Sequence, residues 1–508
     1  MNASRTPLHR QIRSLLQQAL PPGATLGRRR FLELAGSAAA MVAGGNSTYA
    51  VSEQAGPVAI VGGGVAGLTA AYRLMKAGRT VHLFEGSLRL GGRMFSKRNF
   101  NKEGMFVELG GELIDTNHSD IIALAKELGL ETQNLLDGEK GEDVIYFDGQ
   151  VHRHHDVIEA FKPLAAIIAA DAAQVYDKEG NFTDHARKLD AISMGEYLQR
   201  ASPGVEPWII KLIIAAYEPE FGLEVSDLSS LNLVDFIEPD TSKGFKIFGD
   251  SDEALRIRGG NGSIPEALVK VLNGKIEMSL GTQLTQITLT EAGVKLTFAE
   301  KKKTHSSVWS RVIVAVPFTL LSQVKGIDDL PFSSEKKRAI HEMGYGTNVK
   351  VMYGFKKRFW RQPHGEPQHF GNGSVFADEP TFQNVWETSR GQTGDRGIIT
   401  NLLGGKRGLN YTPQAMANYL DDLNKPMPGA KGQHDGNTAI MNWPKMPLNR
   451  GSYSCARVGQ YTWIAKAAAT TECDGRLIFA GEHTSLVSAG FMNGGVESGN
   501  RAAQEIIG

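Results

Sequence analysis

The sequence predicts an α/β fold that opens with a strand, a helix and a second strand. The apolar run Val58–Val61 leads directly into a glycine-rich turn with the pattern G-x-G-x-x-G, which ends at Gly67. Apolar side chains then recur at helical spacing from Leu68 to Met75, and a second apolar run ends in Glu85. A strand, a glycine turn, a helix and a strand that ends in an acid together indicate a dinucleotide-binding βαβ unit.

The glycines and the acid have separate roles in such a unit. Gly62 allows the tight turn, Gly64 lets the backbone approach a pyrophosphate, and Gly67 lets the helix pack closely on the strand. The N-terminus of the helix offers N–H groups to the phosphates. Glu85 accepts hydrogen bonds from a ribose 2′-hydroxyl, so FAD or NAD fits better than NADP.

A second glycine-rich segment, Gly91-Gly92-Arg93, follows Glu85 closely. It places an arginine beside the pyrophosphate, where the planar guanidinium matches two phosphate oxygens better than a lysine would. Gly92 and Arg93 are therefore candidate cofactor contacts, and they favour a flavin over a nicotinamide cofactor.

From this segment on, the chain resembles the flavin-containing amine oxidases, the family of monoamine, polyamine and L-amino acid oxidases. The shared motifs follow the family's order from Val58 to the C-terminus. They are Leu90–Met94, Glu108–Gly111, Val312–Pro317, Thr347–Lys350 with Phe359-Trp360, Trp443 with Tyr453, Ala480–His483 and Gly490–Gly494.

The resemblance implies an amine-oxidase type of fold with two domains. Because the βαβ unit and the last family motifs lie at opposite ends of the chain, the Rossmann-like FAD-binding domain is expected to be discontinuous. A chain of 508 residues exceeds the size of one typical domain, which agrees with this division. We assign residues 56–117, 253–317 and 443–508 to the FAD-binding domain, and 118–252 and 318–442 to an α+β substrate domain.

Local patterns predict further elements. A helix is expected over 120–128 after a cap at Ser119, and Asp148-Gly149 predicts a hairpin that leads into a largely helical region. A second helix is expected from Ile264. Strands are expected over 283–289, 294–298 and 308–316.

Further cofactor contacts come from the resemblance alone. Trp443 is expected to stack near the pyrimidine side of the flavin, and Gly481 and Glu482 belong to the family's C-terminal flavin motif. Monoamine oxidases attach FAD through a cysteine directly before the tyrosine that matches Tyr453, and this chain has Ser452 there. A serine cannot form the thioether, so FAD is expected to be bound non-covalently.

The resemblance also implies three catalytic residues. Lys350 matches the lysine that hydrogen-bonds a water near flavin N5, and Val349 and Val351 indicate that it lies in a buried strand. An unpaired lysine would be costly there. Tyr453 and Phe491 match the two aromatic positions that face each other across the flavin in monoamine oxidases, where the ring faces favour an amine.

Substrate choice rests on the segment Gly110–Asp115. Many L-amino acid oxidases carry an arginine for the substrate carboxylate where this chain has Leu113, which argues against a general α-amino acid site. Glu112 and Asp115 are present instead, and Asp115 matches a tunnel glutamate of plant polyamine oxidases. Two acids favour a pocket for cations, and structural hydrogen bonds beside the flavin explain them equally well.

The resemblance therefore implies an enzyme that carries out FAD-dependent oxidative deamination. The expected reaction moves a hydride from a primary amine, diamine or polyamine to flavin N5 and yields an imine, then an aldehyde, ammonia and hydrogen peroxide, with oxygen as acceptor. The alternative is an L-amino acid oxidase that prefers lysine or arginine. A flavin desaturase or a carrier-linked dehydrogenase is a third interpretation; Lys350, Tyr453 and Phe491 disfavour a desaturase, because desaturases act on apolar substrates.

Composition argues against several other classes. The 55 basic and 55 acidic side chains cancel, so nothing points to nucleic acid as a partner. No metal is expected, since the group His152–Asp156 lies at a predicted hairpin without a second ligand cluster. Two cysteines, Cys455 and Cys473, favour buried free thiols over a disulfide framework. The oligomeric state stays open, with a homodimer as one arrangement.

The first fifty residues resemble an export signal. Gly27–Leu32 contains the twin-arginine pattern, and the apolar stretch 34–45 is too short to act as an anchor in a bilayer. We interpret residues 1–50 as a Tat leader with a small-residue cleavage site at Thr48–Ala50. The expected location is periplasmic or secreted, after export of the folded protein by the Tat machinery, and no membrane anchor is expected.

Export gives the first test. Replacing both Arg28 and Arg29 by lysine should hold the precursor in the cytoplasm, because the Tat machinery reads the paired arginines. The measurement is the amount of protein in the periplasmic and cytoplasmic fractions, compared with the unchanged chain. A normal periplasmic yield would contradict the Tat leader.

Overall fold

The computed structural model describes residues 56–508, except 139–140, 302 and 363–370. The predicted Tat leader, residues 1–50, lies outside the described residues. A five-stranded parallel sheet takes its strands from three separate parts of the chain. In the order β21-β13-β1-β2-β9, the strands are Leu477–Phe479, Arg311–Val314, Val58–Val61, Val81–Glu85 and Glu277–Leu280.

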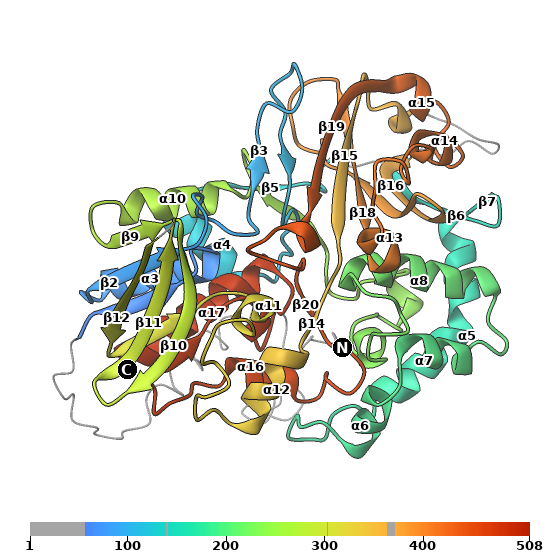
Figure 1. Ribbon diagram of the computed structural model, residues 1–508. Helices are drawn as coiled ribbons and strands as arrows, with labels where there is room; N and C mark the ends of the chain where they lie inside the picture. The colour runs from blue at the N-terminus through green and yellow to red at the C-terminus, as the bar shows by residue number, and fades with distance from the viewer. Residues whose placement is uncertain (1–55, 139–140, 302, 363–370) are drawn as a thin grey trace, which may run out of the picture.

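Both faces of this sheet are covered, which explains why its strands are continuously apolar. Along β1, Val58 and Ile60 pack on helices, whereas Ala59 and Val61 pack on a second, antiparallel sheet. The helices include α3 (Val65–Lys76), α10 (Ser263–Leu272) and α17 (Met492–Ile507), and the antiparallel strands are β10 (Thr282–Thr290), β11 (Gly293–Glu300) and β12 (Lys303–Trp309) (Figure 1).

A seven-stranded sheet forms the other half of the molecule (Figure 1). Neighbouring strands are antiparallel except for β16 and β6, which are parallel. In the order β19-β15-β18-β17-β16-β6-β7, the strands are His434–Asn442, Val349–Phe355, Gly397–Leu403, Phe382–Glu387, Gly371–Glu379, Glu142–Phe147 and Gln150–His152.

A group of helices packs beside this sheet around its own apolar core. Trp208 belongs to that core and stacks on His152 with 3.9 Å between ring centroids. Helix α8 contacts β16 and β17, which ties the helical group to the sheet. The helices are α5 (His154–Ala172), α6 (Asp184–Asp190), α7 (Met194–Ala201), α8 (Pro207–Phe221) and α9 (Leu231–Val234).

Shorter elements connect these layers. The strands are β3 (Ser96–Lys97), β4 (Val107–Glu108), β5 (Thr132–Asn134), β8 (Leu255–Ile257), β14 (Gly344–Tyr345) and β20 (Ser454–Cys455). The α-helices are α4 (Ser119–Glu127), α11 (Phe318–Leu321), α12 (Ser334–Glu342), α13 (Gly405–Leu409), α14 (Tyr419–Asn424), α15 (Ala430–Gln433) and α16 (Ile464–Ala469). The 3-10 helices are η1 (Thr241–Lys243), η2 (Phe359–Arg361), η3 (Trp443–Lys445) and η4 (Glu482–Thr484).

The predicted α/β fold is confirmed, with two corrections in the local elements. Ser119 is the first residue of α4 rather than its cap, and the N-cap position is occupied by His118. The single strand expected over 308–316 is two strands, because Ser310 separates β12, which pairs with β11, from β13, which pairs with β1 and β21. The hairpin at Asp148-Gly149 forms as expected between β6 and β7.

The strands of the two sheets come from different segments of the chain. All five strands of the parallel sheet lie within 56–117, 253–317 and 443–508, and all seven strands of the other sheet lie within 118–252 and 318–442. The domain boundaries themselves stay predictions.

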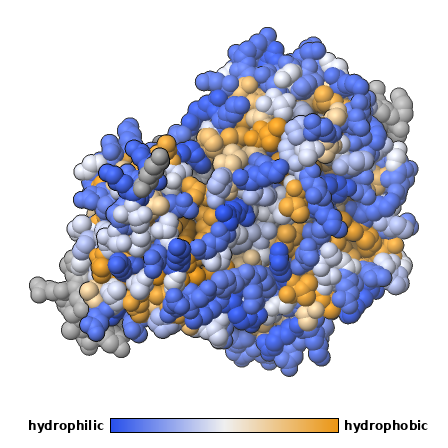
Figure 2. Space-filling view, in the orientation of Figure 1, coloured by the Kyte–Doolittle hydropathy of each residue, from blue (hydrophilic) through white to orange (hydrophobic). Residues whose placement is uncertain are grey.

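The visible surface is mainly hydrophilic, and hydrophobic side chains gather on it in small groups (Figure 2). Within the described residues, no helix combines the length and hydrophobicity needed to cross a bilayer. Cys455 and Cys473 are both buried and unpaired, in agreement with the expected free thiols.

Candidate functional site

One large cavity runs along the carboxyl ends of the parallel strands. The end of β1, the end of β2 and the residues after β13 and β21 all contribute to its wall, which is the usual ligand position in an open α/β sheet. Its volume is about 2170 Å³. Pockets for one small ligand measure about 300–1,000 Å³, so the cavity has room for a dinucleotide together with a substrate.

The glycine-rich turn after β1 forms one end of the cavity. A Cβ on Gly62, where φ is +111°, would lie 2.5 Å from the carbonyl O of Ala315, and a Cβ on Gly67 would lie 2.0 Å from the carbonyl O of Gly62. A Cβ on Gly64 would meet no atom within 4 Å, although Gly64 lines the cavity. The fold itself therefore requires Gly62 and Gly67, whereas Gly64 leaves space for a ligand.

Glu85 lies at the end of β2, beside this turn. Its Oε2 accepts the N–H of Gly63 at 2.7 Å, and its Oε1 accepts the N–H of Ser87 at the same distance. A carboxylate has about four acceptor positions, so Glu85 keeps capacity for the hydroxyls of a ribose. The backbone contacts hold the side chain in the cavity wall before any ligand binds.

Arg93 and Glu482 form an ion pair across the cavity wall. Nη1 of Arg93 lies 2.9 Å from Oε1 of Glu482 and donates to the carbonyl O of Ser452 at 2.6 Å. Nη2 of Arg93 has no partner within the described residues, which leaves it available to a phosphate. Gly92 lies against the turn, since a Cβ there would be 3.1 Å from the Cα of Gly64.

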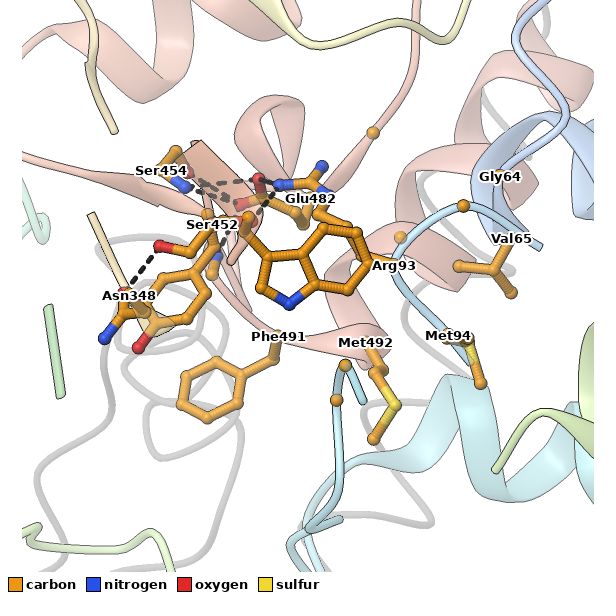
Figure 3. Close-up of a pocket in the computed structure, with 18 of the residues that line it drawn as sticks. Gly64, Val65, Arg93, Met94, Asn348, Ser452, Ser454, Glu482, Phe491 and Met492 are labelled. Carbon is orange, nitrogen blue, oxygen red and sulfur yellow. Dashed lines mark hydrogen bonds and ion pairs between the residues drawn. The ribbon is translucent and has the colours of Figure 1, made fainter. Parts of the chain in front are cut away.

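Glu482 stays ionised although it is buried. Burial raises the pKa of its carboxyl, but Arg93, the Ser454 hydroxyl and the N–H of Gly490 outweigh that effect and hold the pKa below its usual value. Gly481 precedes it with φ of +128°, where only glycine is unstrained, and donates its N–H to Ser498. Figure 3 shows Arg93, Ser454 and Glu482 gathered on one side of the cavity.

The residues present fit a flavin dinucleotide. Trp443 lines the cavity, and its Nε1 donates to the carbonyl O of Leu109 at 3.1 Å, which fixes the indole ring. The hydroxyl of Ser452 donates to Oδ1 of Asn348 at 2.5 Å. Neither Cys455 nor Cys473 is among the residues that line the cavity. The non-covalent attachment of FAD stays a prediction that these positions support.

Lys350 is the second residue of β15 and lines the cavity from within the seven-stranded sheet. The side chain is buried, as Val349 and Val351 predict, and its charge is compensated. Nζ lies 2.8 Å from Oε2 of Glu112 and donates to the carbonyl O of Gly110 at 3.0 Å. The structure therefore brings Lys350 and Glu112 together, which sequence reasoning did not anticipate.

Tyr453 and Phe491 both line the same cavity. The hydroxyl of Tyr453 donates to the carbonyl O of Glu220 at 2.8 Å, so the ring is fixed by the end of α8. Phe491 is the N-cap residue of α17, and its ring packs against His118 with 5.0 Å between centroids. Figure 3 shows the ring of Phe491 among the side chains that line the pocket. Their catalytic roles stay predictions.

The two acids expected to attract substrate are both engaged within the protein. Glu112 pairs with Lys350 and accepts from the Thr388 hydroxyl at 2.7 Å. Asp115 accepts from the Ser251 hydroxyl and from the N–H of Glu253 at 2.9 Å. These contacts favour structural roles for Glu112 and Asp115, and substrate binding by either one stays a prediction.

Other acids, which sequence reasoning missed, line the cavity next to Asp115. Glu253 has φ of +48°, an uncommon backbone conformation outside glycine that is often found at functional sites. Burial raises the pKa of Glu253 to about 8, and the like charges of Glu220, Asp115 and Asp143 add to this effect. The acidic run at 250–253 and the acids at the end of the apolar helix α8 were the available signals.

The cavity has two parts. The first is a cofactor cradle beside the parallel sheet, formed by the glycine turn, Glu85, Arg93 and Glu482, and the second is a charged substrate chamber beside the seven-stranded sheet, around Lys350 and Glu253. This arrangement is that of a flavoenzyme. The family model for flavin containing amine oxidoreductases matches residues 65–507, and the chain belongs to this family.

Relatives of known activity span most of the chain. Flavin-containing amine oxidase A of Sus scrofa is 22% identical over 89% of this chain and 84% of its own length. Putrescine oxidase of Kocuria rosea is 31% identical over 60% of this chain and 65% of its own. The structure of a putrescine oxidase bound to putrescine has a TM-score of 0.71 at 22% identity, covering 89% of this chain and 99% of that one, which shows a shared fold.

The cofactor cradle gives a second prediction. Gly64→Val should yield folded protein without flavin, because the new side chain occupies only the space left for the ligand. The matched control is Gly432→Val, since a Cβ at Gly432 also meets no atom within 4 Å and Gly432 does not line the cavity. Flavin content is read from the absorbance of the purified proteins. Equal flavin in both variants would contradict the assignment of the cradle.

The same protein tests the mode of attachment. Acid or heat precipitation of the unchanged protein should release all of the yellow colour into the supernatant, because Ser452 cannot form a thioether. Flavin that stays in the washed pellet would show a covalent link.

Proposed function

We propose that the protein is an FAD-dependent oxidase of a primary amine, diamine or polyamine. The overall reaction converts the amine, water and dioxygen into an aldehyde, ammonia and hydrogen peroxide. When bound, FAD supplies the acceptor for a hydride from the α-carbon of the substrate. The turn at Gly62 and Gly64 would hold its pyrophosphate, with Arg93, and Glu85 would hold its ribose.

The observation that carries this proposal is the acidic chamber beside Lys350 and Tyr453. Glu253 lies close to three other acids, Glu220, Asp115 and Asp143, whose charges act on its carboxyl. A cluster of acids attracts ammonium groups. The charged residues that line the cavity include the acids Glu112, Asp115, Asp143, Glu220, Asp250, Asp252 and Glu253 and the bases Lys246, Lys350 and Arg390.

The chain's own residues then have defined tasks. Tyr453 and Phe491 wall the chamber with ring faces that favour an amine and exclude water. Because the pKa of Glu253 is raised to about 8, its carboxyl carries a proton at neutral pH and releases it when a cation binds nearby. Glu253 can therefore adjust its charge to that of the substrate.

One observation supports a second candidate, an L-amino acid oxidase for lysine or arginine. Such an enzyme needs a cation for the α-carboxylate, and Arg390 lines the cavity near the acids. Arg390 already donates to the carbonyl O of Glu387 and to the Ser374 hydroxyl, at 3.2 and 3.3 Å. The acids are more numerous, so we rank the amine first. A desaturase of apolar substrates fits such a charged chamber poorly.

We also propose that the protein reaches the periplasm or the exterior through the Tat machinery. The paired arginines at Arg28 and Arg29 support this proposal, because the Tat route accepts folded proteins that already hold a cofactor.

An anaerobic substrate screen tests the proposed function. Putrescine, spermidine, benzylamine, lysine, arginine and leucine are mixed with the oxidised protein, and bleaching of the flavin absorbance is followed. We expect the diamine and polyamine to react fastest and to form hydrogen peroxide once air is admitted. Reaction confined to lysine and arginine would support the second candidate, and reaction with leucine alone would contradict both.

The pKa of Glu253 gives a pH prediction. Below pH 8 the carboxyl is protonated and above pH 8 it is ionised, whereas a diamine stays charged up to a pKa of about 10. The KM for putrescine should therefore fall as the pH rises from 6.5 to 9. In Glu253→Gln the fall should disappear, and the KM at pH 9 should be roughly 10-fold higher than in the unchanged protein.

Two comparisons make this result specific. Benzylamine, which carries a single charge, should show little change in KM between the two proteins. Glu159→Gln changes an exposed acid of α5 that does not line the cavity, and it should behave like the unchanged protein. An unaltered pH profile in Glu253→Gln would remove Glu253 from substrate recognition.

A further inference from the structure

The lysine in the cavity wall is one member of a row of three charged side chains. Lys350 and Glu112 line the cavity, whereas Arg256 does not line it and is completely buried behind them. Nζ of Lys350 lies 2.8 Å from Oε2 of Glu112, and Nη1 of Arg256 lies 3.9 Å from Oε1 of the same carboxylate. The negative charge therefore lies between two positive ones.

Glu112 is fixed from several directions. The Thr388 hydroxyl donates to its Oε1 at 2.7 Å, and Nδ2 of Asn261 donates to its backbone carbonyl O at 2.7 Å. Arg256 is fixed in turn, because it donates to the carbonyl O of Thr388 at 2.8 Å and to that of Arg390 at 2.6 Å. A carboxylate held in this way cannot follow Lys350 if the lysine moves, so it determines where Nζ lies.

The carboxylate is charged in the folded protein. Burial raises the pKa of Glu112, but the charges of Lys350 and Arg256 outweigh burial and hold the pKa below its usual value. The positive charge of Lys350 is thus largely cancelled at close range. A cation weakened by a fixed anion stabilises developing negative charge in the cavity less than a free one.

We propose that Glu112 is a positioning residue that holds Lys350 in place and limits the rate at which the reduced protein passes electrons to dioxygen. This inference rests on the proposed function. The amine loses two electrons and two protons as it is oxidised to an imine. Dioxygen gains the two electrons and the two protons and becomes hydrogen peroxide. Negative charge develops on oxygen in this second stage, so the net charge presented by Lys350 and Glu112 sets its rate.

The test uses Glu112→Gln and needs no amine. The flavin is reduced by light under argon, and the reduced protein is mixed with dioxygen in a stopped-flow instrument. Removing the anion leaves Lys350, the cation of the row that lines the cavity, uncompensated, so reoxidation should be roughly 10-fold faster. The midpoint potential of the flavin, measured by dye titration, should rise, because positive charge favours the reduced form. Slower or unchanged reoxidation with an unchanged potential would overturn the proposal.

A double-mutant cycle separates action through Lys350 from a general effect of charge. Lys350→Met should slow reoxidation, and Glu112→Gln should add nothing in that background. An equal effect of Glu112→Gln with and without Lys350 would overturn the positioning role. If the single Glu112 variant fails to fold, the reoxidation rates of Lys350→Met and of the double variant are compared instead. A difference between these two rates would overturn the proposal.

A matched control shows that the effect belongs to this position. Glu387→Gln makes the same change in another buried glutamate, which pairs with Arg358 and Arg361 and does not line the cavity. Its potential and reoxidation should match those of the unchanged protein, and an equal shift would overturn the proposal. Because light and not an amine reduces the flavin, this experiment tests the role of Glu112 even if the protein does not oxidise amines. Failure of the proposed function is therefore distinguishable from failure of the proposal for Glu112.

Discussion

The site depends on one tight contact, the packing of the glycine turn against the parallel sheet. A Cβ on Gly67 would lie 2.0 Å from the carbonyl O of Gly62, and a Cβ on Gly62 would lie 2.5 Å from that of Ala315. Without side chains at these positions, the N-terminus of α3 lies directly over the ends of β1 and β13. The same edge of the sheet then places Glu85 and Glu482, so one steric constraint aligns the whole cofactor cradle.

The second sheet brings a constraint of a different kind, a buried charge. A lysine within a buried strand is stable only if an anion compensates it. Lys350 finds that anion in Glu112, which belongs to the segment after β4 and not to its own sheet. The ion pair therefore joins the two halves of the molecule at the cavity. It also means that the lysine is not a free cation, which changes what it can do for the chemistry.

The accuracy of sequence reasoning depended on how local each feature is. The βαβ unit was predicted correctly because its turn, helix and acid are determined by neighbouring residues. The prediction of one continuous strand over 308–316 was wrong, because the chain leaves the antiparallel sheet at Ser310 and enters the parallel sheet with β13. Such a break depends on which strands pair with each segment. Burial of Lys350 was predicted from Val349 and Val351, but its partner Glu112 lies 238 residues away in the sequence.

The sequence by itself determined the glycine turn, the order of the family's motifs and the buried position of Lys350, because each depends on residue types at short, fixed spacing. Only the tertiary structure decided which acids remain available in the chamber. Glu112 and Asp115 are engaged by Lys350 and Ser251, whereas burial and, to a smaller extent, nearby like charges raise the pKa of the Glu253 carboxyl. The physical reason is that a carboxylate's behaviour depends on the charges and donors that long-range folding brings within a few ångströms of it.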